Sequence, residues 1–372
     1  MSESPLKIFL VQVITHQREK VLIEQKMEEL DQLVRTYGGL TVVEIVQQRA
    51  KPDYQFFVWK GKLEEIALQM QAQWATLLII DNILKPQQIY KVNEFLKPYK
   101  LEAWDRVDLI LKIFDRHATS MEARLQIELA AIRHMWPRIF GMGMELSRQW
   151  WGKGNVRGIG ETNTERMRRH LAQRKEQVVE KLQQYEHMRA VHRAARKRSQ
   201  LPTVWLVGYT NAGKSSLMHA LTKKDVLIED KLFATLGTTV GKLRIADADA
   251  SKPGKEVLIN DTIWFMRDLP PDLIQAFKST LEDSIEADIL LHVIDAGDPL
   301  VHDKISVVET ILDEIWAKQE RRRVFNKIDT IDQATLALLT HMYQEKNCFF
   351  VSAVSGTGIA DLTQALWTRL VV

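Results

Sequence analysis

The chain has 372 residues, too many for one ordinary core, so its length predicts two or three domains. Hydrophobic residues make up 45% of it, yet no apolar run is long enough for a transmembrane helix, and the single cysteine, Cys348, excludes an intramolecular disulfide framework. The net charge of +3 is unevenly distributed: residues 151–200 hold thirteen Lys or Arg against five Glu, a local charge of +8 that leaves −5 on the rest.

Residues 1–116 alternate short β-like runs with helical ones, which predicts an N-terminal α/β domain with a mostly parallel sheet. The first apolar stretch lacks the basic leader and the cleavage site of a signal peptide, so we expect a strand there. With one cysteine, which suits a reducing compartment, this favours a cytoplasmic protein. Strands are expected over residues 7–15, 41–46 and 75–80, helices over 20–36, 62–70 and 86–96, and a strand or a helix start over 106–114.

Residues 117–200 are expected to form a basic helical hairpin, with one helix over residues 120–136 and a long polar helix over residues 161–198. The charge of residues 151–200 fits either a polyanionic partner or a solvated helix face. Four glycines between the helices lie too close together for a helix to continue, which predicts a glycine-rich loop at Gly152, Gly154, Gly158 and Gly160.

The α/β pattern resumes after Pro202, so residues 201–372 are expected to form a third domain, again with a mostly parallel sheet. A helix is expected from Lys214 onward. The expected strands cover residues 203–207, 257–260, 289–294, 323–325 and 348–351.

The strongest motif follows the strand 203–207 and opens a helix, which is the place of a phosphate-binding P-loop. Its glycines let main-chain N–H groups surround the β-phosphate. Lys214 is expected to reach the β- and γ-phosphates, and the Ser215 hydroxyl to bind Mg²⁺. The motif consists of Gly208, Tyr209, Thr210, Asn211, Ala212, Gly213, Lys214 and Ser215.

A base-reading motif follows the strand 323–325. The Asp329 carboxylate would accept hydrogen bonds from N1–H and the exocyclic amine of guanine, which adenine cannot supply. Alone, this motif is as well explained by a solvated turn, but its position between the P-loop and a further motif after the last strand predicts a guanine-nucleotide-binding G domain. The two motifs consist of Asn326, Lys327, Ile328 and Asp329, and of Ser352, Ala353 and Val354.

A magnesium site is predicted from two further segments. Asp261 directly follows the expected strand 257–260, where a carboxylate can hold the Mg²⁺ shell, and Thr262 comes next. In the loop after the first helix of this domain, Thr235 is the preferred hydroxyl to complete the coordination when the γ-phosphate is present, which would make the loop a switch. Thr238 and Thr239 are alternatives. The loop motif comprises Phe233, Ala234, Thr235, Leu236 and Gly237.

These motifs resemble those of the HflX family of ribosome-associated GTPases, and the likeness covers nearly the whole chain. The P-loop and residues 233–236 are similar to the P-loop and switch I of the family, and residues 44–49, 61–65 and 160–162 match as well. The resemblance implies slow GTP hydrolysis with Mg²⁺ and a glycine-rich hairpin that contacts RNA of the large ribosomal subunit. It also implies that the nucleotide state governs binding or splitting of ribosomes, for example under stress.

On this resemblance, the basic segment 151–200 is expected to bind RNA through phosphate contacts. Trp150, Trp151 and Arg157 are candidates for stacking on unpaired bases, although the tryptophans fit domain packing equally well. We expect a monomer, and a peripheral membrane contact stays open.

Tryptophan stands at three positions where the family usually has glycine: Trp59, Trp151 and Trp264. Trp264 lies in the third nucleotide motif, after Thr262 and Ile263, where the N–H of a glycine approaches the γ-phosphate in the family. An indole needs volume and restricts the main chain there. The sequence therefore suggests that hydrolysis or switching is weaker than in a Trp264→Gly variant.

The next residue, Phe265, occupies the position where many GTPases place a water-orienting glutamine, as the resemblance implies for slow enzymes. Asn211 resembles a P-loop asparagine that helps to hold K⁺ at the phosphates in related GTPases, and K⁺ would add positive charge at the transition state. The expected catalytic residues are therefore Lys214, Thr235 and Asn211.

Two functions from different classes follow. The first is a slow, ribosome-stimulated GTPase, favoured by the phosphate- and metal-binding residues. The second is a scaffold that binds guanine nucleotide and RNA with little or no hydrolysis because of Trp264. An ATP-using RNA remodeller acting through the N-terminal domain has little support, since the sequence contains no second P-loop.

Overall fold

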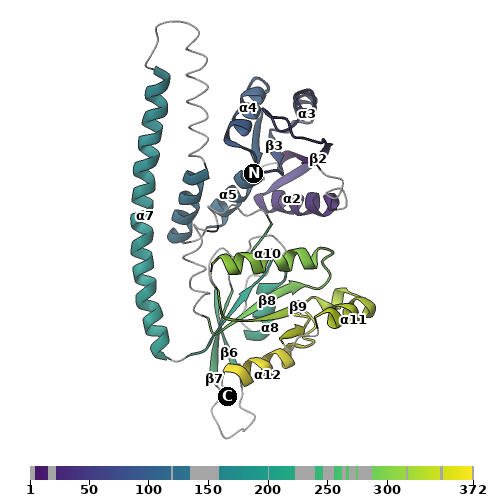
Figure 1. The fold of residues 1–372 in the computed structure, drawn as a ribbon, viewed down its shortest axis with the longest axis vertical. Helices are drawn as coiled ribbons and strands as arrows, with labels where there is room; N and C mark the ends of the chain where they lie inside the picture. The colour runs from purple at the N-terminus through teal and green to yellow at the C-terminus, as the bar shows by residue number, and fades with distance from the viewer. Residues whose placement is uncertain are drawn as a thin grey trace. The chain divides into compact units, whose positions relative to one another are not determined.

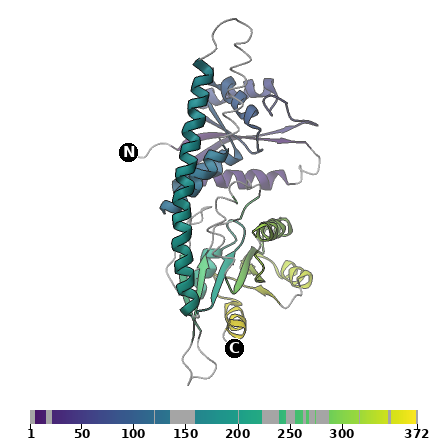
Figure 2. The ribbon, with the colours of Figure 1, turned by 60° about the vertical axis from the view of Figure 1, so that its left-hand side comes forward.

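The computed structural model describes most of the chain, drawn in two views in Figures 1 and 2. It forms two compact units, Met1–Arg116 with Arg124–Leu182, and His117–Ala123 with Gln183–Val372. Each has its own sheet, which confirms the predicted α/β class, while the separation of residues 117–200 as a domain stays a prediction. The described residues are 5–15, 22–118, 120–134, 159–199, 201–222, 239–245, 255–261, 265–267, 274, 287–315, 317–343 and 347–370.

The first unit contains a four-stranded, fully parallel sheet in the order β2-β1-β3-β4. The three predicted strands are present, and β4 is an additional one. With four residues and a charged side chain at each end, β4 shows too little alternation to be recognised in the sequence. The strands are β1 (Leu6–Ile14), β2 (Gly39–Gln48), β3 (Leu77–Ile80) and β4 (Glu102–Asp105).

The helices between residues 23 and 117 follow the predicted pattern, and the ambiguous segment 106–114 is helical. Helix α4 begins with a proline, whose fixed φ suits the first helical position. The helices are α2 (Ile23–Tyr37), α3 (Lys60–Ala72), α4 (Pro86–Leu96), the short 3₁₀ helix η1 (Lys97–Tyr99) and α5 (Arg106–His117).

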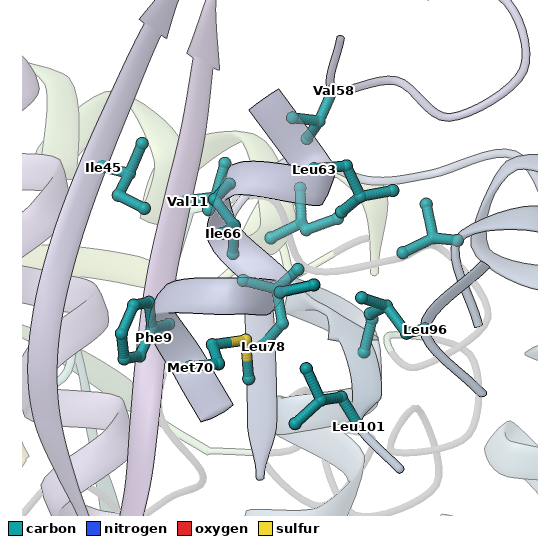
Figure 3. Close-up of a cluster of buried hydrophobic side chains, with 14 of the residues drawn as sticks. Phe9, Val11, Ile45, Val58, Leu63, Ile66, Met70, Leu78, Leu96 and Leu101 are labelled. Carbon is teal, nitrogen blue, oxygen red and sulfur yellow. The ribbon is translucent and has the colours of Figure 1, made fainter. Parts of the chain in front are cut away.

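One face of this sheet carries a hydrophobic core. Phe9 and Val11 of β1 pack in one cluster with Leu63, Ile66 and Met70 of α3, and Figure 3 shows these side chains converging from the strand and the helix. All five are fully buried. The alternation along β1 sends its even-numbered residues to the opposite face, so both faces of the sheet are covered, as parallel sheets require.

Helix α3 ends in a motif that normally contains glycine. The N–H of Ala75 donates to the carbonyl of Met70 at 2.9 Å and that of Trp74 to the carbonyl of Gln71 at 3.3 Å, the two hydrogen bonds of a Schellman motif. Trp74 stands at its left-handed position with φ +57°, whereas α2 ends with Gly38 at φ +91°. The Trp74 side chain is 84% exposed, so its packing does little to offset this strain.

We therefore expect Trp74→Gly to raise the free energy of unfolding of the first unit by about 1 kcal/mol, because glycine removes the left-handed strain. Urea unfolding followed by hydrogen exchange of α3 measures the gain. Trp74→Ala is the matched control, since it removes the indole but keeps a Cβ at the same φ and should give little or no gain. Equal stabilisation by both variants would contradict this explanation.

A helix over residues 121–134 and the 41-residue α7 (Ile159–Ser199) carry the predicted helical segments of the middle of the chain. Arg174 of α7 donates from Nη2 to Oε2 of Glu128 at 2.8 Å, so the two helices are in contact. Helix α7 begins at Ile159, so Gly160 lies within it and the prediction that the helix starts at residue 161 was two residues too late. The rest of the expected glycine-rich loop lies outside the described residues. No helix in the described part of the chain is both long and apolar enough to span a bilayer.

The second unit contains a six-stranded sheet in the order β10-β9-β8-β5-β7-β6. All pairs are parallel except β6 with β7, so the predicted mostly parallel sheet is confirmed and β6 is an unpredicted antiparallel edge strand. The strands are β5 (Thr203–Val207), β6 (Thr239–Ile245), β7 (Lys255–Asp261), β8 (Ile289–Asp295), β9 (Glu320–Asn326) and β10 (Cys348–Phe350).

Helices cover both faces of this sheet. Buried residues of α8 (Lys214–Thr222) and α12 (Ile359–Leu370) share one cluster with β5, and those of α10 (Val301–Glu314) and α11 (Gln333–Met342) share another with β9. Because β5, β7, β8 and β9 are parallel, their carboxyl ends meet at one edge, where a ligand site of an open α/β sheet is expected.

Candidate nucleotide-binding site

The P-loop connects β5 to α8, and its two glycines cannot be replaced without a clash. A Cβ on Gly208 would lie 2.3 Å from the carbonyl oxygen of Val293, in the neighbouring strand β8. Gly213 has φ +84°, and a Cβ there would lie 2.3 Å from Nδ2 of Asn326. The glycine spacing of the motif therefore has a direct cause in the close approach of β8 and β9 to the loop.

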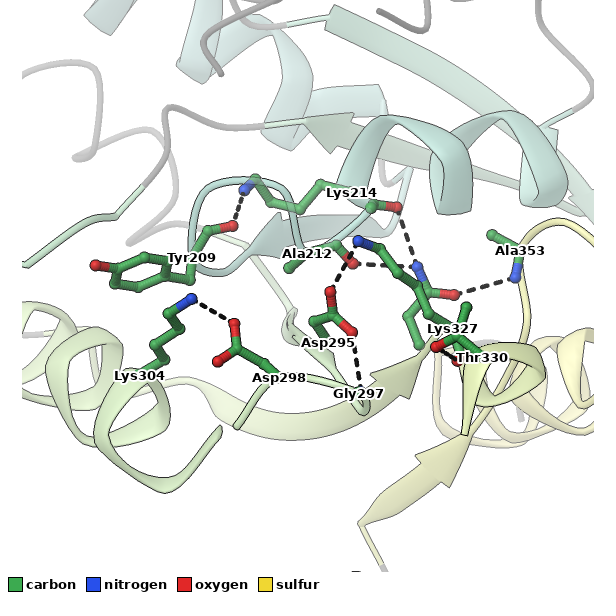
Figure 4. Close-up of polar contacts among 12 residues, drawn as sticks. Tyr209, Ala212, Lys214, Asp295, Gly297, Asp298, Lys304, Lys327, Thr330 and Ala353 are labelled. Carbon is green, nitrogen blue, oxygen red and sulfur yellow. Dashed lines mark hydrogen bonds and ion pairs between the residues drawn. The ribbon is translucent and has the colours of Figure 1, made fainter. Parts of the chain in front are cut away.

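Lys214 reaches back into this loop. Its Nζ donates to the main-chain oxygens of Gly208 at 2.9 Å and Tyr209 at 2.8 Å, as Figure 4 shows for Tyr209. Burial lowers the pKa of Lys214 to about 7, and the nearby charge of Asp261 opposes that shift only in part. The side chain is thus positioned within a ring of main-chain groups, where an anionic phosphate would favour its charged form.

We expect GDP binding above pH 7 to take up a proton at Lys214. With a pKa of about 7, roughly nine-tenths of the amine is neutral at pH 8 in the free protein, and phosphate charge restores the ammonium form. Calorimetric titrations at pH 8 in two buffers of different ionisation enthalpy should report uptake of nearly one proton. The same titrations at pH 6, where the free amine is already charged, are the control.

The low pKa of Lys214 also predicts that the nucleotide-free protein becomes more stable as the pH rises above 7. An unfolded lysine keeps its proton up to about pH 10.5, whereas folded Lys214 loses it at about pH 7. The free-energy penalty of burying the charge is therefore full below pH 7 and disappears as the pH rises from 7 towards 10.5.

For the calorimetric titrations of GDP binding, identical apparent enthalpies in the two buffers at pH 8 would show that Lys214 does not take up the proton.

Two side-chain oxygens of the kind that Mg²⁺ binds lie side by side at the end of the P-loop. Ser215 donates from Oγ to Oδ2 of Asp261 at 2.8 Å, and Asp261 is fully buried at the carboxyl end of β7. Mg²⁺ prefers oxygen ligands and keeps few protein contacts when phosphates are present. The pair therefore fits Mg²⁺, which would neutralise phosphate charge when bound.

Asn326 joins the P-loop to the last motif. Its Nδ2 donates to the carbonyl of Ala212 at 3.1 Å, and its Oδ1 accepts from the N–H of Ala353 at 3.0 Å. Ser352 is fully buried beside it, whereas Asp329 is exposed in the 3₁₀ helix η2 (Ile328–Thr330). A single amide thus contacts the P-loop and the last motif, at the edge of the sheet where the strands bring all three motifs together.

Asp295 is a site residue that the sequence analysis missed. It ends β8, and its Oδ2 accepts from Nζ of Lys327 at 2.8 Å while its Oδ1 accepts from the N–H of Gly297 at 3.0 Å (Figure 4). Lys327 has φ +63°, and its side chain passes close to Gly213. Asp295 could have been recognised in the sequence, because it stands at the end of a predicted strand as Asp261 does.

Several predicted residues cannot be placed. The loop residues 233–238 with Thr235, and Thr262, Ile263 and Trp264 of the third motif, lie outside the described residues, as do Trp150 and Trp151. Asn211 is exposed in the P-loop with φ +60°. Phe265 is only 2% exposed, so its ring packs inside the unit and no hydrogen-bonding side chain stands at that position.

Three family models match successive parts of the chain. They are described as "GTP-binding GTPase N-terminal" over residues 24–115, "GTP-binding GTPase Middle Region" over residues 117–196 and "50S ribosome-binding GTPase" over residues 203–327.

Curated relatives are similar over most of their length. The chain is 42% identical to the GTPase HflX of Caldanaerobacter subterraneus subsp. tengcongensis, over 83% of this chain and 70% of that one. It is 38% identical to the GTPase HflX of Escherichia coli K12, over 93% of this chain and 79% of that one.

Two solved structures have a similar fold. A crystal structure of SsGBP with GDP is 24% identical with a TM-score of 0.55, covering 98% of both chains. A GTP-binding protein from Sulfolobus solfataricus with GDP is 24% identical with a TM-score of 0.50, covering 98% of this chain and 99% of that one. At this identity the likeness concerns the fold alone.

Proposed function

The chain belongs to the HflX family of GTPases, and on that premise we propose that it hydrolyses GTP slowly on its own, associates with the large ribosomal subunit and splits ribosomes under stress. The observation that carries the proposal is the Lys214 side chain turned back into the P-loop together with the Ser215–Asp261 pair, in the part of the chain that matches a "50S ribosome-binding GTPase" model. We infer a monomer that works in the cytoplasm.

The proposed reaction is in-line attack of water on the γ-phosphate. Lys214 neutralises charge on the β- and γ-phosphates, Ser215 and Asp261 hold Mg²⁺, and Thr235 completes its shell. Because Phe265 is buried and apolar, it cannot orient the attacking water. Asn211, exposed in the P-loop, is our candidate to hold K⁺, which would add positive charge where the transition state needs it.

Helix α7 supports an RNA partner. Its side chains at Arg168, Lys175 and Lys181 are exposed, as is Arg169, which is ion-paired with Glu165, so these residues supply positive charge on several faces of the helix for phosphate contacts. Such contacts release counterions, and affinity for the large subunit should therefore fall steeply as salt is raised.

A scaffold that binds guanine nucleotide and RNA with little hydrolysis is the competing function, and Trp264 in the third motif favours it. GTP turnover measured with and without purified large subunits separates the two. We expect the subunits to stimulate the wild type, and a scaffold would show no turnover in either case.

Trp264→Gly is expected to hydrolyse GTP several-fold faster than the wild type in a single-turnover assay, because glycine frees the main chain next to the γ-phosphate. Equal single-turnover rates and equal GTP/GDP affinity ratios in both proteins would remove the reason to treat Trp264 as inhibitory.

Running the same assay in K⁺ and in Na⁺ tests the role of the cation, with the faster rate expected in K⁺. Equal rates in the two salts would contradict the proposed role of K⁺ in hydrolysis.

A further inference from the structure

Tyr209 follows the first glycine of the P-loop, but its side chain points away from Lys214 (Figure 4). Its main-chain oxygen accepts a hydrogen bond from Nζ of Lys214. The ring is 4% exposed and lines a small cavity with Asp298 and Lys304. A phenol buried this deeply normally has a hydrogen-bond partner for its hydroxyl.

The partner of the hydroxyl is a main-chain N–H group that comes just after the third nucleotide motif in the sequence. The N–H of Arg267 donates to the Tyr209 hydroxyl at 2.7 Å. The main chains also pair in an isolated parallel bridge, in which the N–H of Thr210 donates to the carbonyl of Phe265 at 2.9 Å and the N–H of Phe265 donates to that of Gly208 at 3.3 Å. Of these three hydrogen bonds, only the one at Arg267 depends on a side chain.

The ring itself is held from the other side by α10. The Lys304 ammonium lies 4.8 Å from the ring centroid and is also ion-paired with Asp298. A cation over a buried aromatic face favours one orientation of the ring. The hydroxyl is therefore aimed at residue 267 by packing and charge.

We propose that Tyr209 is a positioning residue for GTP hydrolysis, whose hydroxyl fixes the segment 265–267, which follows the third nucleotide motif in the sequence, against the P-loop. The inference rests on the GTP hydrolysis of the proposed function. It goes beyond the P-loop motif, which requires only that the residue after Gly208 supply a main-chain oxygen and N–H.

Tyr209→Phe tests this inference because it removes the hydroxyl and keeps the ring over Lys304. We expect kcat to fall about five-fold, the factor that corresponds to one ordinary hydrogen bond, while the Kd for GDP stays within two-fold. Hydrogen exchange of the peptide that contains Arg267 should accelerate, since its N–H loses the acceptor. Tyr343→Phe is the matched control, because it removes a hydroxyl that is bonded to Nδ1 of His302 at 2.6 Å, away from the P-loop.

Unchanged kcat together with unchanged exchange at Arg267 would overturn the inference. So would an equal weakening of GDP and GTP binding, because that result indicates support of the whole loop rather than of the γ-phosphate side. If the wild type shows no turnover even with large subunits, the proposed hydrolysis fails, yet the GTP/GDP affinity ratio and the exchange rate still decide the role of Tyr209.

Discussion

Replacing Asp329 with asparagine should change the preferred nucleotide from a guanine to a xanthine nucleotide. A carboxylate only accepts hydrogen bonds and so matches N1–H and the exocyclic amine of guanine. Asparagine presents one donor and one acceptor, which match the C2 carbonyl and N1–H of xanthine. With GTP, the amide would face the exocyclic amine donor to donor, so GTP affinity is expected to fall by about 10³-fold or more.

Equilibrium binding of fluorescent GDP and XDP analogues measures this exchange. Asp332→Asn is the matched control, since it removes the same charge three residues away, where the carboxylate caps α11 by accepting from the N–H of Thr335 at 2.8 Å. It should leave the base preference unchanged. If Asp329→Asn still preferred guanine, η2 would not be the base-reading element.

The motifs of the second unit could be predicted because their chemistry is local. A loop between a strand and a helix with glycine, lysine and serine at fixed spacing defines a phosphate cradle without knowledge of the rest of the fold. The contacts that assemble the site are different: Asn326 meets Ala212 across 114 positions, and Asp295 meets Lys327 across 32. No local pattern carries such pairings, since they arise from the order of the strands in the sheet.

Local sequence patterns also fail to predict two features of the backbone, the strand β6 and the left-handed conformation of Trp74. Strand β6 is an edge strand that pairs on one side only, and its antiparallel direction follows from the connection rather than from its residues. Trp74 reads as an ordinary hydrophobic residue in the sequence, and only its φ of +57° reveals that it occupies a position suited to glycine. Trp264 was recognised for a different reason, since it falls inside a known motif.

The buried ion cluster of the first unit could not be anticipated from sequence either. Arg106 begins α5 and is 3% exposed, and its Nη1 donates to Oδ1 of Asp81 at 2.6 Å while Nη2 donates to Glu29 of α2. It thereby joins the end of β3 to a helix 77 residues earlier in the chain. Asp81 and Glu29 are themselves largely removed from water.

Arg106→Met should therefore destabilise the first unit by about 3–5 kcal/mol, because two buried carboxylates lose their cation while methionine keeps the volume. Urea unfolding with hydrogen exchange of β1 and β3 as the readout measures the loss, and GDP affinity should stay within two-fold because the nucleotide site lies in the other unit. Arg106→Lys keeps the charge but cannot donate to both carboxylates in the geometry of a guanidinium, so its loss of stability should fall between zero and that of Arg106→Met.

Arg35→Met is the exposed control. The ion pair of Arg35 with Asp31 involves a side chain that is 74% exposed, so the loss of stability should be below about 1 kcal/mol. If Arg106→Met unfolded no more readily than Arg35→Met, the cluster would be a passive consequence of the fold rather than a contact that holds α2, β3 and α5 together.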